Sequence, residues 1–351
     1  MNRSSARRPC AGRPGVERRT AWSRFGFDAA ALSRPTAPVR EILNLLGIIL
    51  PVFLLIGVGV ALRRLRWLTP EADPSLLRIS VNLLFPCLIF QAVVGNAALR
   101  EPGNLVWPAL LGFGSMGLGW LAGWWTARAI GLERGRGLRT FAFTVGFYNY
   151  GYMAIPLVKA QFGPGTLGVL FVFNTGIEMA IWTVGILLLA GGSLRQDWRK
   201  IFNAPAVSLV LAVALNALQA TPPAPVRATV DWLAGCAVPL GLVLIGAVLD
   251  EHLHDLRSLL APRIVGAATL LRLGVLPVVF LAAAKWLPVS TELKQVIIVQ
   301  AAMPAGVFPI VLARHYGGQP LTAAQIVVGT TLAALVLIPL WISFGLAWVA
   351  P

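Results

Sequence analysis

One acidic side chain lies deep within an apolar stretch of this sequence. Glu178 occurs in the run Phe173-Asn-Thr-Gly-Ile-Glu-Met-Ala-Ile-Trp182. Asn174 precedes it by four residues, so the two side chains share a face if the stretch is helical. A carboxyl group inside a membrane segment is costly and by default marks a functional site. We expect Glu178 either to serve in proton coupling or to be a protonated glutamate that is hydrogen-bonded between helices.

Two other apolar stretches share a pattern of helix-breaking residues. They read Gly146-Phe-Tyr-Asn-Tyr-Gly-Tyr-Met-Ala-Ile-Pro156 and Ala301-Ala-Met-Pro-Ala-Gly-Val-Phe-Pro309. Proline removes a backbone donor and breaks a helix, and we expect Pro156, Pro304 and Pro309 to do so here. Broken backbone at bilayer depth is tolerated only beside protein or a wet cavity. The pattern therefore predicts two interrupted helices.

Such interruptions would place two helix N-termini near the middle of the membrane. Each N-terminus has free N–H groups and carries roughly half a positive charge, which favours a carboxylate. An asparagine amide at the break, Asn149, would either contact the ligand or satisfy freed backbone groups. We predict a substrate site built from Tyr148, Asn149, Gly151, Asn174, Pro304, Ala305 and Gly306.

A single cation, Arg272, lies near the middle of an apolar stretch, residues 262–287. The sequence leaves three interpretations open. Arg272 is a partner for a bound anion, an ion-pair partner for Glu178, or a residue that extends its charged end to the membrane interface.

The composition requires a membrane protein. Of 351 residues, 57% are apolar and 12% are charged, whereas a soluble domain carries about twice that charge. Hydropathy and turn residues predict ten apolar segments, at residues 42–62, 74–96, 105–127, 138–160, 164–190, 203–219, 227–249, 262–287, 293–314 and 321–349. The fold expected is an all-α polytopic membrane protein with an N-terminal tail at 1–40.

Charge in the links predicts the orientation. Thirteen Lys and Arg follow the odd-numbered segments and five follow the even-numbered ones, so the odd links should be cytoplasmic and both ends of the helical body should face outward. Residues 1–40, with nine Arg against Glu17 and Asp28, contradict this rule. We interpret them as translated upstream sequence with a natural start near Val39, or else as a disordered basic tail.

The segment patterns recur five segments apart. A mid-segment proline marks the second segment (Pro86) and the seventh (Pro239), and the interrupted pattern marks the fourth and ninth. Because five is odd, a repeated five-helix unit must insert upside down the second time. The sequence thus predicts two inverted repeats, at 41–192 and 193–351.

These motifs resemble the auxin efflux carrier family, the PIN-like transporters and their bacterial relatives. The resemblance rests on Glu41–Gly59, Val238–Leu249, the Asn149…Pro156 stretch and Pro304–Pro309, and it covers about residues 41–350. It implies ten helices, with the fourth and ninth unwound and crossing. It also implies a dimerising scaffold of helices 1, 2, 6 and 7. Tyr148 and Ala305 depart from the plant carriers, and bacterial relatives more often handle malate or malonate.

We therefore expect a secondary transporter of a small organic anion in the inner membrane, working as a homodimer by alternating access. The alternative is a cation/proton exchanger, although such exchangers usually pair carboxylates and Glu178 stands alone. The spans contain neither HExxH nor GxSxG, so we expect no enzyme, no cofactor and no metal site. With no basic stripe interleaved with aromatics, we expect no nucleic acid partner. The GxGxxG match at 112–117 lies inside an apolar span and favours helix packing.

Overall fold

The computed structural model describes residues 37–190, 202–253 and 261–349. The chain divides into two units, residues 1–40 and 41–351, and the second unit is the helical body. The tail expected at 1–40 lies almost wholly outside the described residues. The described part is helical and contains one isolated β-bridge.

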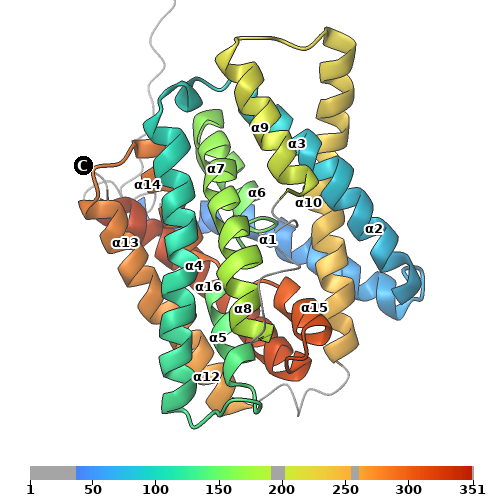
Figure 1. Cartoon of the computed structure of the whole chain (residues 1–351), viewed down its shortest axis with the longest axis vertical. Helices are drawn as coiled ribbons and strands as arrows, with labels where there is room; N and C mark the ends of the chain where they lie inside the picture. The colour runs from blue at the N-terminus through green and yellow to red at the C-terminus, as the bar shows by residue number, and fades with distance from the viewer. Residues whose placement is uncertain (1–36, 191–201, 254–260, 350–351) are drawn as a thin grey trace, which may run out of the picture. The chain divides into compact units, whose positions relative to one another are not determined.

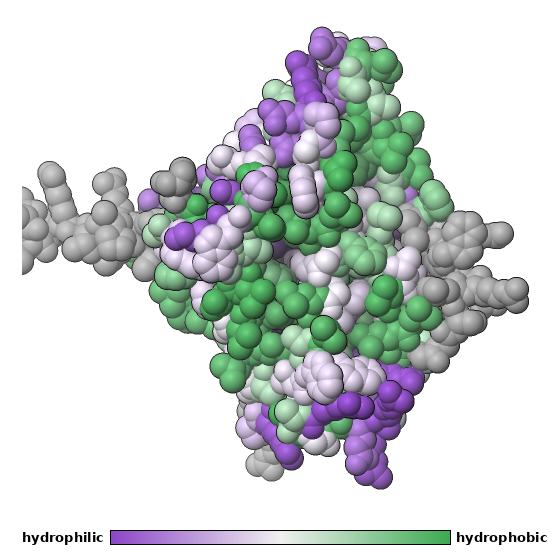
Figure 2. All heavy atoms as spheres, turned by 60° about the vertical axis from the view of Figure 1, so that its left-hand side comes forward, coloured by the Kyte–Doolittle hydropathy of each residue, from purple (hydrophilic) through white to green (hydrophobic). Residues whose placement is uncertain are grey.

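Seven of the ten predicted segments are helical runs that are long and apolar enough to cross a bilayer, judged on the described residues. They comprise α1 (Ala37–Arg64), η1 (Pro70–Ala72) to α3 (Phe85–Val93), α4 (Gly103–Ala129), α7 (Pro164–Ala180) to α8 (Ile186–Ala190), α10 (Ala224–Leu253), α12 (Pro262–Leu270) to α13 (Leu276–Trp286), and α16 (Pro320–Val349). An eighth segment, α9 (Ala204–Ala217), is apolar but shorter. Figure 2 shows apolar side chains over the middle of one face and hydrophilic ones toward two opposite ends.

The other two predicted segments are interrupted. Helix α5 (Leu138–Gly146) and helix α6 (Ala154–Gln161) are separated by residues 147–153. Helix α14 (Thr291–Ala302) and helix α15 (Phe308–His315) are separated by residues 303–307. Both interruptions lie where glycine, proline and asparagine predicted them. Pro156 and Pro309, however, lie in the first turns of α6 and α15, where a missing N–H costs nothing, so they begin half-helices rather than end them.

The two interruptions meet. Tyr148 and Ala305 form the isolated antiparallel bridge. The backbone N–H of Asn149 donates to the carbonyl of Pro304, and that of Gly306 donates to the carbonyl of Phe147, each at 2.8 Å. Backbone groups freed by one broken helix are thus satisfied by the other, which makes unwound chain tolerable at this depth.

Three helical runs contain a π-turn: η2 (Ser80–Leu84), η4 (Ile181–Gly185) and η7 (Leu271–Val275). Proline follows two of these turns, at Pro86 and Pro277. Because Pro277 lacks an N–H, it cannot bond the carbonyl of Leu273, and the indole N–H of Trp341 donates to that carbonyl at 2.7 Å. A side chain of α16 therefore supplies the hydrogen bond that the proline leaves unmade in the α12–α13 run.

Glycines let the helices around the interruptions approach closely. A Cβ added to Gly112 of α4 would lie 2.1 Å from the carbonyl oxygen of Phe173 in α7. A Cβ added to Gly176 of α7 would lie 1.9 Å from the carbonyl oxygen of Ala109 in α4. The helix-packing interpretation of the GxGxxG match is confirmed at Gly112, while Gly117 has open space beside it. Figure 1 shows α4 and α7 side by side along much of their length.

Candidate functional site

A cavity of about 460 Å³ lies beside the point where the interrupted helices meet. One wall comes from η2, α3, α9 and α10, and the opposite wall from α7 and the two interruptions. The lining includes Phe85, Tyr148, Asn149, Tyr150, Gly151, Tyr152, Asn174, Glu178, Trp182, Asn203, Gly241, Gly306 and Phe308. No Lys, Arg or His is among the described residues that line it.

The carbonyl of Tyr150 anchors the interruption after α5. The amide of Asn174 donates to it at 3.2 Å, and the amide of Gln300, in α14, donates to it at 3.1 Å. Gln300 also donates to the side-chain oxygen of Asn174 at 3.1 Å. Asn174 and Gln300 are both buried, so this network holds the unwound segment against α7 and α14 without exposing backbone to lipid.

Asn149 closes the start of α6. Its side-chain oxygen accepts a hydrogen bond of 3.4 Å from the backbone N–H of Met153, and the residue also lines the cavity. A short amide side chain can accept such a bond from backbone that the interruption frees, here in the turn that precedes α6. The structure thus places Asn149 where it serves the backbone and, at the same time, faces the space a ligand would fill.

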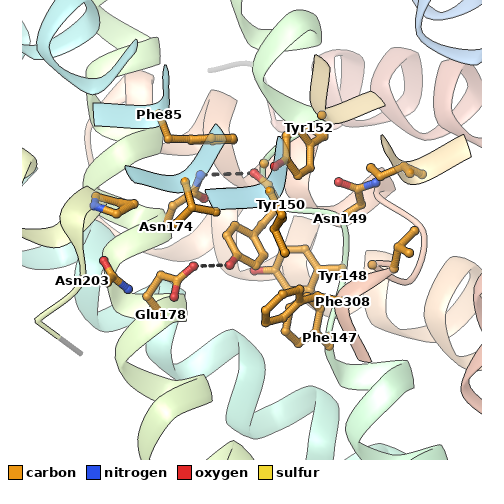
Figure 3. Close-up of a pocket in the computed structure, with 18 of the residues that line it drawn as sticks. Phe85, Phe147, Tyr148, Asn149, Tyr150, Tyr152, Asn174, Glu178, Asn203 and Phe308 are labelled. Carbon is orange, nitrogen blue, oxygen red and sulfur yellow. Dashed lines mark hydrogen bonds between the residues drawn. The ribbon is translucent and has the colours of Figure 1, made fainter. Parts of the chain in front are cut away.

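Glu178 of α7 lines the cavity close to Asn203, the residue that precedes α9 (Figure 3). The hydroxyl of Tyr150 donates to one oxygen of its carboxyl group, and the indole N–H of Trp182 donates to the other at 2.9 Å. The amide of Asn203, at the start of α9, approaches the same group. Each of these partners can donate a hydrogen bond, and together they fix the orientation of the carboxyl group.

Aromatic rings form much of the cavity wall. The rings of Phe147 and Phe308, one from each side of the meeting point, have centres 6.4 Å apart. Phe85 of α3 meets Tyr152 edge-on at 5.1 Å. Tyr152 also packs directly on Gly241 of α10, where an added Cβ would lie 1.7 Å from the ring. We call this contact of Tyr152 with Phe85 and Gly241 the aromatic seal.

Arg272 is fully buried and lies behind the cavity wall rather than in it. Its guanidinium donates to the carbonyls of Gln300 and Met303, each at 2.8 Å, and its central carbon lies 4.3 Å from the centre of the Tyr148 ring. The expectation that it reaches the membrane interface is wrong. The pairing with Glu178 does not occur within the described residues, because Tyr150 and Trp182 hold that carboxyl group. Arg272 instead caps the end of α14.

Six predicted site residues line the cavity: Tyr148, Asn149, Gly151, Asn174, Glu178 and Gly306. Pro304 and Ala305 build the bridge beside it and are absent from its lining among the described residues. Sequence reasoning missed Tyr150, Tyr152, Gln300 and Asn203. The alternation Tyr-Asn-Tyr-Gly-Tyr at 148–152 carried a signal for the first two, because adjacent polar aromatics are unusual inside an apolar span.

These features define a class of protein. Several apolar helical runs, two interrupted helices that meet, and a cavity at their meeting point are typical of multi-pass membrane proteins that move solutes. Within the described residues, no cluster of three or more His, Cys, Asp or Glu could hold a metal.

Comparison with known proteins gives the family. A family model described as a membrane transport protein matches residues 45–197 and 192–342. The chain belongs to this family, the auxin efflux carriers that its motifs resembled, and it is a transporter rather than an enzyme. It is 27% identical over 299 residues to an uncharacterized transporter of Methanothermobacter thermautotrophicus, a match covering 84% of this chain and 96% of that protein.

Proposed function

We propose that this protein is a secondary transporter that carries a small organic anion, a mono- or dicarboxylate such as malate or malonate, across the cell inner membrane. The observation that carries the proposal is the position of the cavity. Gly151, in the turn that precedes α6, and Phe308, the first residue of α15, both line it. Two helix N-termini close to one cavity favour a carboxylate without a lysine or arginine in the lining.

Arg272 strengthens the preference for an anion. Its charge lies behind the ring of Tyr148, which itself lines the cavity. No carboxylate lies within salt-bridge distance of it in the described part of the chain. In a medium of low polarity, this field reaches an anion in the cavity with little screening.

The arrangement of helices favours alternating access. We infer ten membrane segments in two inverted repeats, residues 41–192 and 193–351, with the interrupted fourth and ninth helices crossing near the midplane. In this scheme α1, η1 to α3, α9 and α10 form a static scaffold that dimerises, and the remaining helices move. The cavity lies between these two groups.

The cavity extends toward one end of the helices. Val248 near the end of α10, Val311 in α15 and Leu77 in α2 (Asp73–Ile79) all line it. At that end Glu251 of α10 lies 4.0 Å from Arg63 and 3.9 Å from Arg314 of α15. The excess of arginine there indicates the cytoplasmic side, so we assign this structure to a cytoplasm-facing state, with both ends of the helical body outside. The aromatic seal closes the opposite end.

Uptake into liposomes tests the function. Purified protein in proteoliposomes should accumulate labelled malate or malonate above protein-free liposomes, with saturation at rising concentration and competition by the unlabelled acid. Absence of uptake for a panel of mono- and dicarboxylates would contradict the anion assignment.

A cation/proton exchanger remains the second candidate, and one observation favours it. The charged residue in the described lining is a glutamate, and a carboxylate attracts a cation. Exchange of sodium for protons in the same proteoliposomes, without any organic anion present, would favour this alternative over the first.

A further inference from the structure

Two ionisable side chains of opposite charge lie in the interior of the helical body. Glu178 lies in α7 and faces the cavity, and Arg272 lies in η7 behind it. A buried charge is tolerated when another charge or several hydrogen bonds compensate it. When both are ionised, the negative charge of Glu178 and the positive charge of Arg272 sum to zero in the interior, although the two side chains do not touch.

Two tyrosine rings separate these charges. Arg272 lies over the ring of Tyr148, the rings of Tyr148 and Tyr150 meet edge-on with centres 6.4 Å apart, and the hydroxyl of Tyr150 bonds Glu178. Both rings line the cavity. A ligand in the cavity is therefore exposed to both charges.

The groups facing Glu178 are hydrogen-bond donors, which offset part of the cost of burying its carboxylate when the cavity is empty. Tyr150, Trp182 and Asn203 each present a donor to it, and Tyr152 is a further titratable group nearby. Helix α14 contributes the amide Gln300 through Asn174, and α4 meets α7 near Gly112 and Ala109. No Lys, Arg, His or second carboxyl group faces the cavity among the described residues.

An entering anion upsets this balance. It brings a negative charge into a cavity of about 460 Å³ that already holds the carboxylate of Glu178. Like charges in one poorly solvated site favour protonation of the weaker acid present. A proton on Glu178 removes one negative charge from the site, and the protonated carboxyl group donates a hydrogen bond to the anion.

We propose that Glu178 takes up one proton whenever an organic anion occupies the cavity, so that proton and anion cross the membrane together. This rests on the proposed anion transport. The proton comes from the aqueous phase on the loading side, forms an O–H bond with a carboxyl oxygen, and leaves to water on the release side. In the loaded state the single O–H of Glu178 donates to the anion, while the Tyr150 hydroxyl continues to donate to the carboxyl group.

The test measures proton and anion fluxes together. Proteoliposomes containing a lumenal pH-sensitive dye receive labelled malonate, and the ratio of protons to malonate entering is recorded. For the wild type we expect about one proton per malonate, and uptake that rises about tenfold per pH unit of external acidification. Glu178→Gln should lower the ratio to less than a tenth and abolish the acceleration by acid. Glu133→Gln, which changes an exposed loop glutamate, should retain the wild-type ratio.

A second variant covers the case in which Glu178→Gln fails to fold. Tyr150→Phe keeps the ring and removes the donor to the carboxylate, so the midpoint of the pH profile of uptake should move upward by about one unit. A merely structural role for Tyr150 would change the rate and leave the midpoint in place, which would overturn the proposal. So would malonate uptake by Glu178→Gln with an unchanged proton ratio. If the wild type takes up malonate with no proton flux, proton coupling is wrong and anion transport stands; if it takes up no anion, both are wrong.

Discussion

At the scale of single residues, Asn149 combines two tasks. Its side-chain oxygen accepts a hydrogen bond from the backbone N–H of Met153, in the turn before α6, and it lines the cavity at the meeting point of the interrupted helices. The 3.4 Å length of this bond indicates a weak interaction, which leaves the amide able to turn toward a ligand. We therefore propose that Asn149 acts mainly on the ligand.

Replacement of this residue tests that assignment. Asn149→Ala should weaken malonate binding about 10- to 100-fold, because a hydrogen bond to a charged group contributes about 1.5–3 kcal/mol. Equilibrium binding of labelled malonate to protein in nanodiscs measures it. Size-exclusion chromatography should show that the variant folds and associates as the wild type does, including in the proposed dimer. Asn82→Ala is the matched control, because Asn82 is exposed and bonds its own helix at Arg78. Normal binding by Asn149→Ala would show that the residue only supports the backbone.

At the scale of elements, the aromatic seal depends on the absence of a side chain at position 241. Gly241→Ala would bring a Cβ to 1.7 Å from the Tyr152 ring, so the ring must leave its place between α3 and α10. We expect a stability loss of about 1–3 kcal/mol and a lower melting temperature in detergent. Gly235→Ala on the same helix has open space and should behave as wild type.

The double variant Gly241→Ala/Tyr152→Ala separates this effect from a general weakness of α10. Removal of the ring should recover most of the stability lost in Gly241→Ala, giving a coupling energy of about 1 kcal/mol or more. Purely additive losses would show that Tyr152 and Gly241 do not act together.

A second packing contact carries a comparable prediction. Gly112→Ala should destabilise the protein by about 2 kcal/mol or more, because the new Cβ would meet backbone of α7 rather than a movable side chain. Gly117→Ala, on the same helix, faces open space and should cost nothing measurable by thermal unfolding. Equal melting temperatures for the two variants would contradict the close approach of α4 and α7.

Sequence alone predicted the interruptions because proline, glycine and asparagine act on the backbone nearby. It also singled out Glu178, since a carboxyl group in an apolar span stands out in any arrangement. It could not predict that Gln300 would hold the carbonyl of Tyr150, or that Arg272 would cap α14, because these contacts join residues 150 and 28 positions apart. Effects of a residue on its own backbone could be predicted from the sequence, whereas contacts between residues far apart in the chain could not.

At the scale of the whole molecule, the cavity lies between two groups of helices that we propose move relative to each other. The ion pair of Glu251 with Arg314 joins α10 of the proposed scaffold to α15 at the end that we propose faces the cytoplasm. The aromatic seal joins α3 and α10 to the interruption between α5 and α6, toward the other end. Transport would require the first end to close as the second opens, so that the anion and the proton on Glu178 change sides together.

The most direct test is whether the cavity is the transport route. In a chain whose three native cysteines are replaced, Val311→Cys places a thiol in the cavity lining. Val336→Cys on α16, an exposed position outside the described lining, is the control. A thiol reagent applied in proteoliposomes should block labelled malonate uptake by Val311→Cys, malonate should slow that modification, and the control should keep its uptake. Complete modification of Val311→Cys with unchanged uptake would contradict the account.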